Sequence, residues 1–177
     1  MKIKNLERFA KGWRGIVYTG FYKGKKVAVK EGRTVKNEWK WLKKLNRYGI
    51  GPKIIGFDGR LVYEFVEGER FVDFIKRKDK EKVNRVIKII LRKMRKMDKL
   101  KINKEEMHNP VKHIFVGKKI KMIDFERCRE SEKPKNVTQF CQFLMRKRLV
   151  SKRVIKVLKE YKKDYNEKNF KKILEFF

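Results

Sequence analysis

Both histidines of this 177-residue chain, His108 and His113, lie just before a segment that ends in the carboxylate of Asp124. Two short apolar runs flank a Gly-Lys-Lys turn there, so we expect a β-hairpin over residues 113–124. An aspartate at the end of an apolar strand can hold a divalent cation together with phosphate oxygens. Imidazole is suited to general base chemistry near neutral pH. The segment therefore predicts phosphate and metal chemistry.

A lysine and a glutamate far upstream can complete such a site. Lys30 closes an apolar strand, and Glu38 shares one face of a predicted helix with Val35, Leu42 and Leu45. A glutamate on an inward apolar face is costly unless a cation meets it. We therefore expect Glu38 to pair with Lys30, which would hold the ammonium ready for phosphate oxygens.

Two glycines, Gly12 and Gly15, stand between two predicted strands. Glycines allow a backbone to approach phosphates closely, although an ordinary hairpin turn explains the same pattern. The P-loop motif G-x-x-x-x-G-K-[ST] is missing from the sequence, which disfavours a P-loop NTPase.

The elements that must position these residues divide into a strand-rich and a helical part. The first part predicts a small antiparallel sheet and one helix that Thr34 can cap. Its expected strands are Phe9–Ala10, Ile16–Tyr22, Lys26–Lys30, Ile54–Phe57 and Leu61–Val66, with the helix ending near Asn46. We expect Trp13, Trp39 and Trp41 to pack within this part.

The second part predicts one long helix over residues 80–100, marked by apolar residues at helical spacing, and three shorter helices near the end of the chain. The fold class is therefore α+β. We expect a single domain of two lobes, residues 1–66 and residues 67–177.

Taken in order, these motifs resemble the protein-kinase fold. Ala10–Tyr18 resembles the glycine-rich loop with Ala10 in place of its first glycine, Val62–Gly68 resembles the adenine-binding hinge, and Asp124-Phe125-Glu126 is similar to the magnesium-binding Asp-Phe-Gly motif. The resemblance implies a two-lobed kinase-like fold that binds ATP. The ATP-binding residues that it implies are Gly12, Gly15, Val17, Ala28, Lys30, Glu38, Glu64 and Val66.

The chain departs from the family where the catalytic loop is expected. Kinases place an aspartate and an asparagine before the hairpin, and alignment from the hairpin puts His108 and His113 at these two positions. Aligning His108 with the histidine of the motif would instead put Pro110 at the aspartate. Neither alignment keeps the catalytic aspartate.

Three interpretations of this departure remain open. His108 can orient or deprotonate a hydroxyl, and His113 can join Asp124 as a metal ligand, which suits Mn²⁺ better than Mg²⁺. Alternatively, the site binds nucleotide without transferring phosphate. A hydrogen-bonded loop role is the simplest explanation of each histidine. By family resemblance Lys112 faces the transferred phosphate, and Glu126 replaces a glycine and adds a possible metal oxygen.

The second lobe has no Ala-Pro-Glu motif, and only ten residues separate Glu126 from the next predicted helix. The chain therefore looks like the minimal atypical kinases of archaea, similar to the RIO kinases of ribosome maturation and the KEOPS-complex kinase of tRNA modification. This resemblance implies a serine/threonine protein kinase that acts near ribosome or tRNA machinery and uses ATP and Mg²⁺.

Charge points to a polyanionic partner. Lysine and arginine number 52 against 21 acidic residues, a net charge of +31. Residues 76–101 hold 13 basic and 3 acidic residues, and residues 144–163 hold 9 and 1. We expect these helices to bind RNA phosphates, although a merely solvated basic face is the common alternative.

No apolar stretch approaches the length of a membrane span, and the two cysteines fit no zinc pattern, so a soluble cytoplasmic protein is expected. The first functional hypothesis is a kinase-like phosphotransferase near an RNA-containing assembly. The second is a catalytically silent kinase-fold module that binds RNA or a ribonucleoprotein. A small-molecule kinase of the aminoglycoside-phosphotransferase type is disfavoured by the positive charge.

Overall fold

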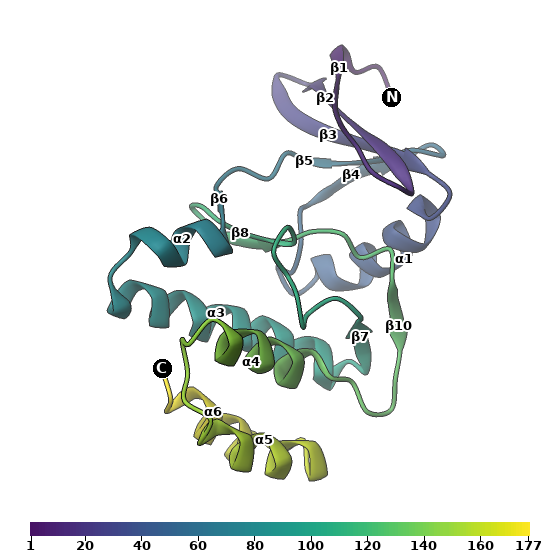
Figure 1. The fold of residues 1–177 in the computed structure, drawn as a ribbon. Coiled ribbons are helices and arrows are strands. Elements are labelled where there is room, and N and C mark those ends of the chain that lie inside the picture. The colour runs from purple at the N-terminus through teal and green to yellow at the C-terminus, as the bar shows by residue number, and fades with distance from the viewer. The chain divides into compact units, whose positions relative to one another are not determined.

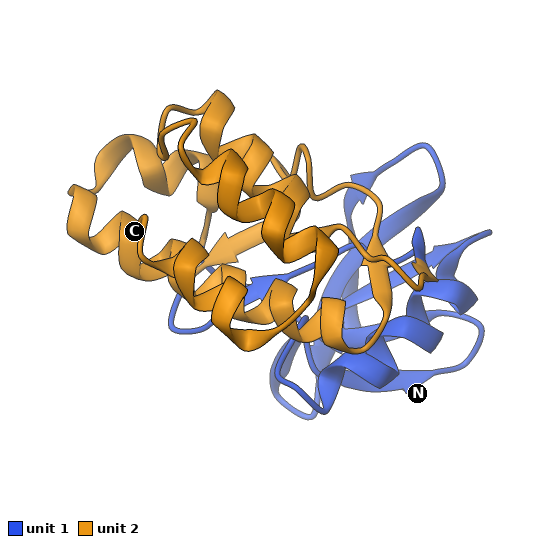
Figure 2. Ribbon diagram, turned by 90° about the horizontal axis from the view of Figure 1, so that it is seen from below, with its two compact units in different colours: residues 1–68, 117–128 blue, residues 69–116, 129–177 orange.

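The computed structural model describes residues 1–177 as ten strands and six helices. The chain forms two compact units, shown in blue and orange in Figure 2: unit 1 comprises residues 1–68 and 117–128, and unit 2 comprises residues 69–116 and 129–177. An α+β fold with a five-stranded antiparallel sheet and six helices agrees with the predicted class. The segment Gly117–Cys128, which we assigned to the second lobe from the sequence, groups with unit 1.

The five-stranded sheet of unit 1 has the order β1-β2-β3-β5-β4 (Figure 1). Its strands are β1 (Lys4–Lys11), β2 (Gly15–Tyr22), β3 (Lys25–Gly32), β4 (Ile54–Phe57) and β5 (Leu61–Glu64). Lys23 and Gly24 join β2 to β3 with positive φ angles of 49° and 74°, the conformation of a two-residue hairpin turn.

The two faces of this sheet bury different side chains, because successive residues of a strand point to opposite sides. Val27, Val29 and Val62 form the apolar cluster of one face. On the other face Lys30 lies opposite Val17 of β2 and Leu61 of β5. The Lys30 side chain therefore starts from an apolar face of the sheet.

Helix α1 (Val35–Asn46) buries the face that the sequence predicted. Val35, Glu38, Leu42 and Leu45 are buried along it, together with Trp41. Thr34 occupies the position before the helix, but its side chain makes no capping hydrogen bond. The capping role expected for Thr34 is therefore wrong, and its hydroxyl has another acceptor, described below.

Unit 2 is mainly helical. It contains α2 (Phe71–Arg77), α3 (Lys80–Lys99), α4 (Asn136–Arg146), α5 (Val154–Lys163) and α6 (Glu167–Leu174), with the short strands β6 (Glu69–Arg70), β7 (Ile102–Lys104) and β8 (Ile114–Val116). Helix α3 packs against α4 and α6, and α5 packs against α6. The strand β10 (Cys128–Glu130) starts at the boundary between the units and pairs with β7.

A buried polar cluster joins three helices of unit 2. Asp98 of α3 accepts hydrogen bonds from the Tyr161 hydroxyl of α5 at 2.8 Å and from the Asn136 side-chain amide of α4 at 2.7 Å. Arg95 is buried beside them and donates to the Tyr161 hydroxyl at 3.2 Å. Each of these four side chains therefore makes at least one hydrogen bond inside the fold, although Arg95 Nε has no hydrogen-bonding partner.

The sequence predicted most of the helices but missed several short elements, namely α2, β6, β7 and β10. It also began β1 five residues too late, since the strand starts at Lys4. The hairpin expected over residues 113–124 corresponds to β8 and to β9 (Ile120–Met122). None of the helices is long and apolar enough to cross a membrane.

Candidate active site

Three carboxylates surround the ammonium of Lys30 within unit 1. Its Nζ lies 2.6 Å from Glu38 Oε2, 3.2 Å from Asp124 Oδ1 and 3.2 Å from Glu126 Oε2. The Lys30 side chain is 13% exposed. Burial alone would lower the pKa of Lys30, but the charges of Glu38, Asp124 and Glu126 outweigh it and raise the pKa above its ordinary value. Lys30 therefore stays protonated at every physiological pH.

Glu38 connects Lys30 to the end of the hairpin segment. Its side chain is 3% exposed, and the contact with Lys30 expected from the helical periodicity is present. Its second oxygen, Oε1, accepts a hydrogen bond from the backbone N–H of Phe125 at 3.2 Å. One carboxylate of α1 thereby fixes both the ammonium of β3 and the backbone that follows Asp124.

Asp124 has a left-handed backbone, with a φ of 65°. Aspartate is one of the few residues that adopt this conformation readily, and such positions are frequent at functional sites. Its side chain is 30% exposed, so it is the most accessible of the three carboxylates around Lys30. Asp124 is thus the carboxylate that a ligand reaches first.

Glu126 is held by four groups from the first third of the chain. Its oxygens accept from Arg14 Nη1 at 2.9 Å and from the Thr34 hydroxyl at 2.7 Å, besides the contact with Lys30. Its backbone carbonyl accepts from Asn37 at 2.6 Å. Burial would raise the pKa of Glu126, but Arg14, Thr34 and Lys30 together lower it to about 2. Glu126 is therefore an ionised anchor that joins these segments.

The two glycines of the predicted phosphate loop have different surroundings. A Cβ atom on Gly15 would lie 2.3 Å from the carbonyl oxygen of Glu31, because Gly15 pairs with Gly32 across β2 and β3. A Cβ on Gly12 would meet nothing closer than 3.7 Å. Gly15 is therefore required by strand packing, whereas Gly12 borders open space.

The remaining residues expected to bind ATP lie on strands of the same unit. Ala28 is buried between Thr19 of β2 and Tyr63 of β5, on the face that carries Lys30. Glu64 ends β5 and forms an ion pair with Lys121 at 2.6 Å, and Val66 is half-buried just beyond it. Burial would raise the pKa of Glu64, but Lys121 lowers it.

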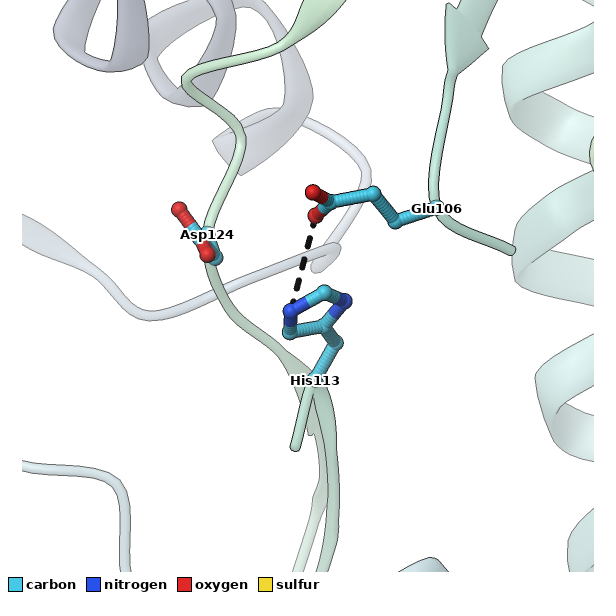
Figure 3. Close-up of side chains that lie close together, drawn as sticks. All are labelled: Glu106, His113 and Asp124. Atoms are coloured by element: carbon cyan, nitrogen blue, oxygen red, sulfur yellow. Dashed lines mark ion pairs between the residues drawn. The ribbon is translucent and has the colours of Figure 1, made fainter. Parts of the chain in front are cut away.

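The catalytic residues expected from the loop before the hairpin belong to unit 2. His113 is half-buried, and its Nε2 lies 3.5 Å from Glu106 Oε2 (Figure 3). His108 is exposed and lines a pocket of about 370 Å³ with Asn109, Phe143, Arg146 and Lys147. Lys112 is exposed. Glu106 was missed, since nothing in its spacing from His113 indicates a pair.

The residues predicted to bind metal, His113 and Asp124, belong to different units. Within unit 1, one oxygen from each of Glu38, Asp124 and Glu126 lies within 4.8 Å of the others. Carboxylate oxygens are the ligands that Mg²⁺ prefers, so the donor set of this unit fits a magnesium ion. Asp124, the most exposed of the three, would be its main ligand, because Glu38 is bound to Lys30 and the backbone of Phe125, and Glu126 to Arg14, Thr34 and Lys30.

Sequence reasoning missed Arg14, Thr34 and Asn37, all of which contact Glu126. A signal was available for one of them. An acid two residues after Asp124 needs a cation when it is buried, and Arg14 stands in the loop between Gly12 and Gly15. The contacts of Thr34 and Asn37 cross about 90 residues of sequence and have no local signature.

The basic residues of unit 2 differ in their exposure. Arg95 is buried in the cluster around Asp98, so it cannot contact a polyanion. Between α4 and α5 lies a groove of about 510 Å³ that presents basic and polar side chains. Among its lining residues are Lys135, Thr138, Gln139, Gln142, Lys159 and Lys162.

Comparison with known proteins gives a limited result. No protein-family model matches the chain. The chain is 26% identical over 114 residues to an uncharacterized protein of Methanocaldococcus jannaschii, MJ1211. The match covers 59% of this chain and 98% of that protein. That protein is uncharacterized, so this similarity assigns no activity to the chain.

Proposed function

We propose that the protein is a minimal, atypical kinase-like phosphotransferase that uses Mg-ATP. The observation that carries this proposal is the cluster in which Lys30, Glu38 and Asp124 meet from three separate segments of unit 1. These three residue types at these contacts match the roles that the family resemblance assigns to them. A buried lysine bound to a helix glutamate is held ready to contact phosphate oxygens.

Mg²⁺ would supply charge neutralisation on the transferred phosphate, which is a main part of phosphoryl-transfer catalysis. Lys30 would bind phosphate oxygens, and Glu38 would keep its ammonium in position. Gly12, beside open space, leaves the backbone accessible to a phosphate. Val17 and Ala28 lie on the sheet face that carries Lys30 and would contact the adenine.

The resemblance assigns His108, Lys112 and His113 to the transfer step. Glu106 Oε2 lies 3.5 Å from His113 Nε2 and orients the imidazole. We propose that this loop positions the phosphate acceptor, with His113 held by Glu106.

The proposed setting is an RNA-containing assembly. The groove between α4 and α5 presents Lys135, Lys159 and Lys162 around polar amides, and exposed lysines attract phosphates without reading bases. The protein substrate of the kinase-like reaction is not specified by this groove. It supports RNA as a partner that brings the enzyme to its substrate.

The test is transfer of radiolabelled γ-phosphate from ATP, with Mg²⁺ or Mn²⁺, to proteins of a ribosomal or tRNA-containing fraction. Transfer is expected for the natural protein and is expected to fall at least 100-fold in Lys30→Met and Asp124→Asn. Lys25→Ala, an exposed lysine at the start of the same strand, is the matched control and should retain transfer.

A silent nucleotide-binding module is the second candidate, because all three carboxylates around Lys30 are already engaged by its ammonium. Thermal shift with Mg-ATP separates the two functions. Binding that depends on Lys30 and Asp124 without any phosphate transfer would favour the silent module. Absence of any ATP-dependent shift would exclude both.

A further inference from the structure

Trp13 is fully exposed, in contrast to the packing role expected from the sequence. Its exposed fraction is 100%, whereas Trp41 is buried and Trp39 stacks on Phe57 with ring centroids 4.8 Å apart. The expectation for Trp13 is therefore wrong. A tryptophan without any packing is a large apolar surface in water, and such surfaces commonly mark binding sites.

Trp13 lies at the tip of the hairpin between β1 and β2. The Gly12 N–H donates to the carbonyl of Gly15 at 2.9 Å, which closes a tight loop around Trp13 and Arg14. The loop lies beyond Lys11 and Ile16, the last paired residues of β1 and β2, and Trp13 is fully exposed there.

Trp13 lines an open pocket of about 560 Å³ in unit 1 with Arg14, Gly32, Arg33 and Thr34. The pocket thus combines one aromatic ring with two guanidinium groups. Gly32 has a φ of 149°, and a Cβ there would lie 2.3 Å from the carbonyl of Arg14. A side chain at this position would therefore collide with the backbone of the loop that carries Trp13 and Arg14.

The combination of groups selects one class of ligand. An exposed indole stacks on a flat ring, and a guanidinium binds phosphate through paired N–H donors. An unpaired nucleotide carries both a flat base and a phosphate, whereas a duplex hides its bases within the stack. A net charge of +31 favours a polyanionic strand over an isolated phosphorylated side chain.

We propose that this pocket binds one unpaired nucleotide of an RNA strand, with the base stacked on Trp13 and the adjoining phosphate on Arg14 and Arg33. The proposal rests on the RNA association proposed above, and it adds a second contact point in the other unit. It requires neither ATP binding nor phosphate transfer.

Arg14 links this pocket to the cluster around Lys30. Its Nη1 donates to Glu126 Oε1 at 2.9 Å, and the neighbouring Oε2 accepts from Lys30. A phosphate that binds Arg14 competes with Glu126 for the guanidinium. RNA binding in the pocket therefore loosens one anchor of the carboxylate that restrains Lys30, which couples the RNA partner to the proposed nucleotide site.

The test is titration of the full chain with fluorescein-labelled octauridylate, without ATP, followed by both tryptophan fluorescence and label anisotropy. Stacking is expected to quench Trp13, and Trp13→Ala is expected to weaken binding about tenfold. Arg33→Ala is expected to weaken binding a few-fold and to lower the salt dependence by about one ion. A hairpin RNA without unpaired bases should not quench Trp13.

Matched controls keep the result specific. Phe21→Ala removes another exposed aromatic of the same sheet, 43% exposed, and should leave affinity unchanged. Lys159→Ala, in the groove of unit 2, should lower affinity but leave the quench at saturation intact. An unchanged affinity in Lys159→Ala would contradict RNA binding in the groove of unit 2 and would leave the pocket proposal standing.

Three outcomes would overturn the pocket proposal. The first is equal affinity of Trp13→Ala and Phe21→Ala for the octauridylate. The second is quenching of Trp13 by a phosphoserine peptide but not by RNA, which would assign the pocket to a phosphorylated protein. The third is the same quench by ATP alone at lower concentration, which would assign it to the free nucleotide.

Discussion

In unit 1 Glu126 accepts hydrogen bonds from two cations, Arg14 and Lys30, whereas in unit 2 Asp98 accepts from the neutral groups of Tyr161 and Asn136. The pKa values of these two carboxyl groups shift in opposite directions. The cations lower the pKa of Glu126 against the effect of burial, and burial raises the pKa of Asp98 despite its hydrogen bonds. The difference separates a charged site from a structural joint between helices.

Charge balance makes the same distinction. Lys30 and Arg14 meet three carboxylates in unit 1, so the named groups carry a net negative charge that a metal ion would neutralise. In unit 2 the direct donors to the carboxylate of Asp98 are neutral, and the one cation of the cluster, Arg95, bonds to the Tyr161 hydroxyl instead. Strongly coupled ionic clusters are frequent at functional sites, whereas satisfied neutral networks stabilise a unique packing.

The largest effect is expected from removing the cation of unit 1. Lys30→Met leaves three carboxylates around a buried position without compensation, so we expect a loss of about 3–5 kcal/mol in the free energy of unfolding. Urea denaturation at pH 7 measures it. A loss below about 1 kcal/mol would show that water already screens the cluster and would remove the contrast between the units.

Asp98→Ala is expected to cost about 2–3 kcal/mol, because it leaves the Tyr161 hydroxyl and the Asn136 amide without their buried acceptor. Asp98→Asn keeps an acceptor oxygen and should cost about 1 kcal/mol. The same denaturation measurement applies. Equal losses for the two substitutions would mean that the charge of Asp98, and not its hydrogen bonding, supports unit 2.

The pH dependence of stability should have opposite signs for the two carboxyls. The folded pKa of Glu126 is about 2 against an ordinary 4.5, so its contribution is present above pH 4.5 and is lost as the pH falls toward 2. Asp98 has a raised pKa, so its contribution is present below its ordinary pKa of 3.8 and is lost as the pH rises through the raised value.

Urea denaturation between pH 2 and 7 tests these signs. Glu126→Gln should flatten the loss of stability on acidification, whereas Asp98→Asn should make that loss steeper, because it removes the opposing contribution. The same direction of change in both variants would contradict the assignment of charged and neutral surroundings.

The smallest effect is expected from Arg14→Ala. The guanidinium is 41% exposed, so solvent screens its bond to Glu126, and the expected loss is about 1 kcal/mol or less. Thermal unfolding at low and high salt measures it, with the difference from the natural protein shrinking at high salt. A larger loss that salt does not change would show that Arg14 supports the fold through packing.

Local patterns predicted the parts of this comparison that lie close in sequence. Helical periodicity placed Glu38 on the inward face of α1, and the cost of burying it predicted its bond to Lys30, eight residues away. Strand-like runs bounded by turn residues likewise predicted β2 and β3. These features depend on spacing within single elements, which sequence reasoning handles well.

The parts that were not predicted depend on contacts between distant residues. The four partners of Glu126 and the cluster around Asp98 join segments 38 to 112 residues apart, so no local pattern predicts them. The exposure of Trp13 was missed for a different reason. A tryptophan is usually buried, and only the tight loop between β1 and β2 reveals that this one is not.

The discontinuity of unit 1 has a consequence for biosynthesis. Lys30 and Glu38 leave the ribosome almost together, but Asp124 and Glu126 follow about 90 residues later, after half of unit 2 has been synthesised. All five strands of the sheet are therefore synthesised by residue 64, but the cluster around Lys30 must wait for two of its three acidic groups. A chain interrupted before residue 117 would carry the lysine and its first partner but would be unable to complete the fold of its own N-terminal unit.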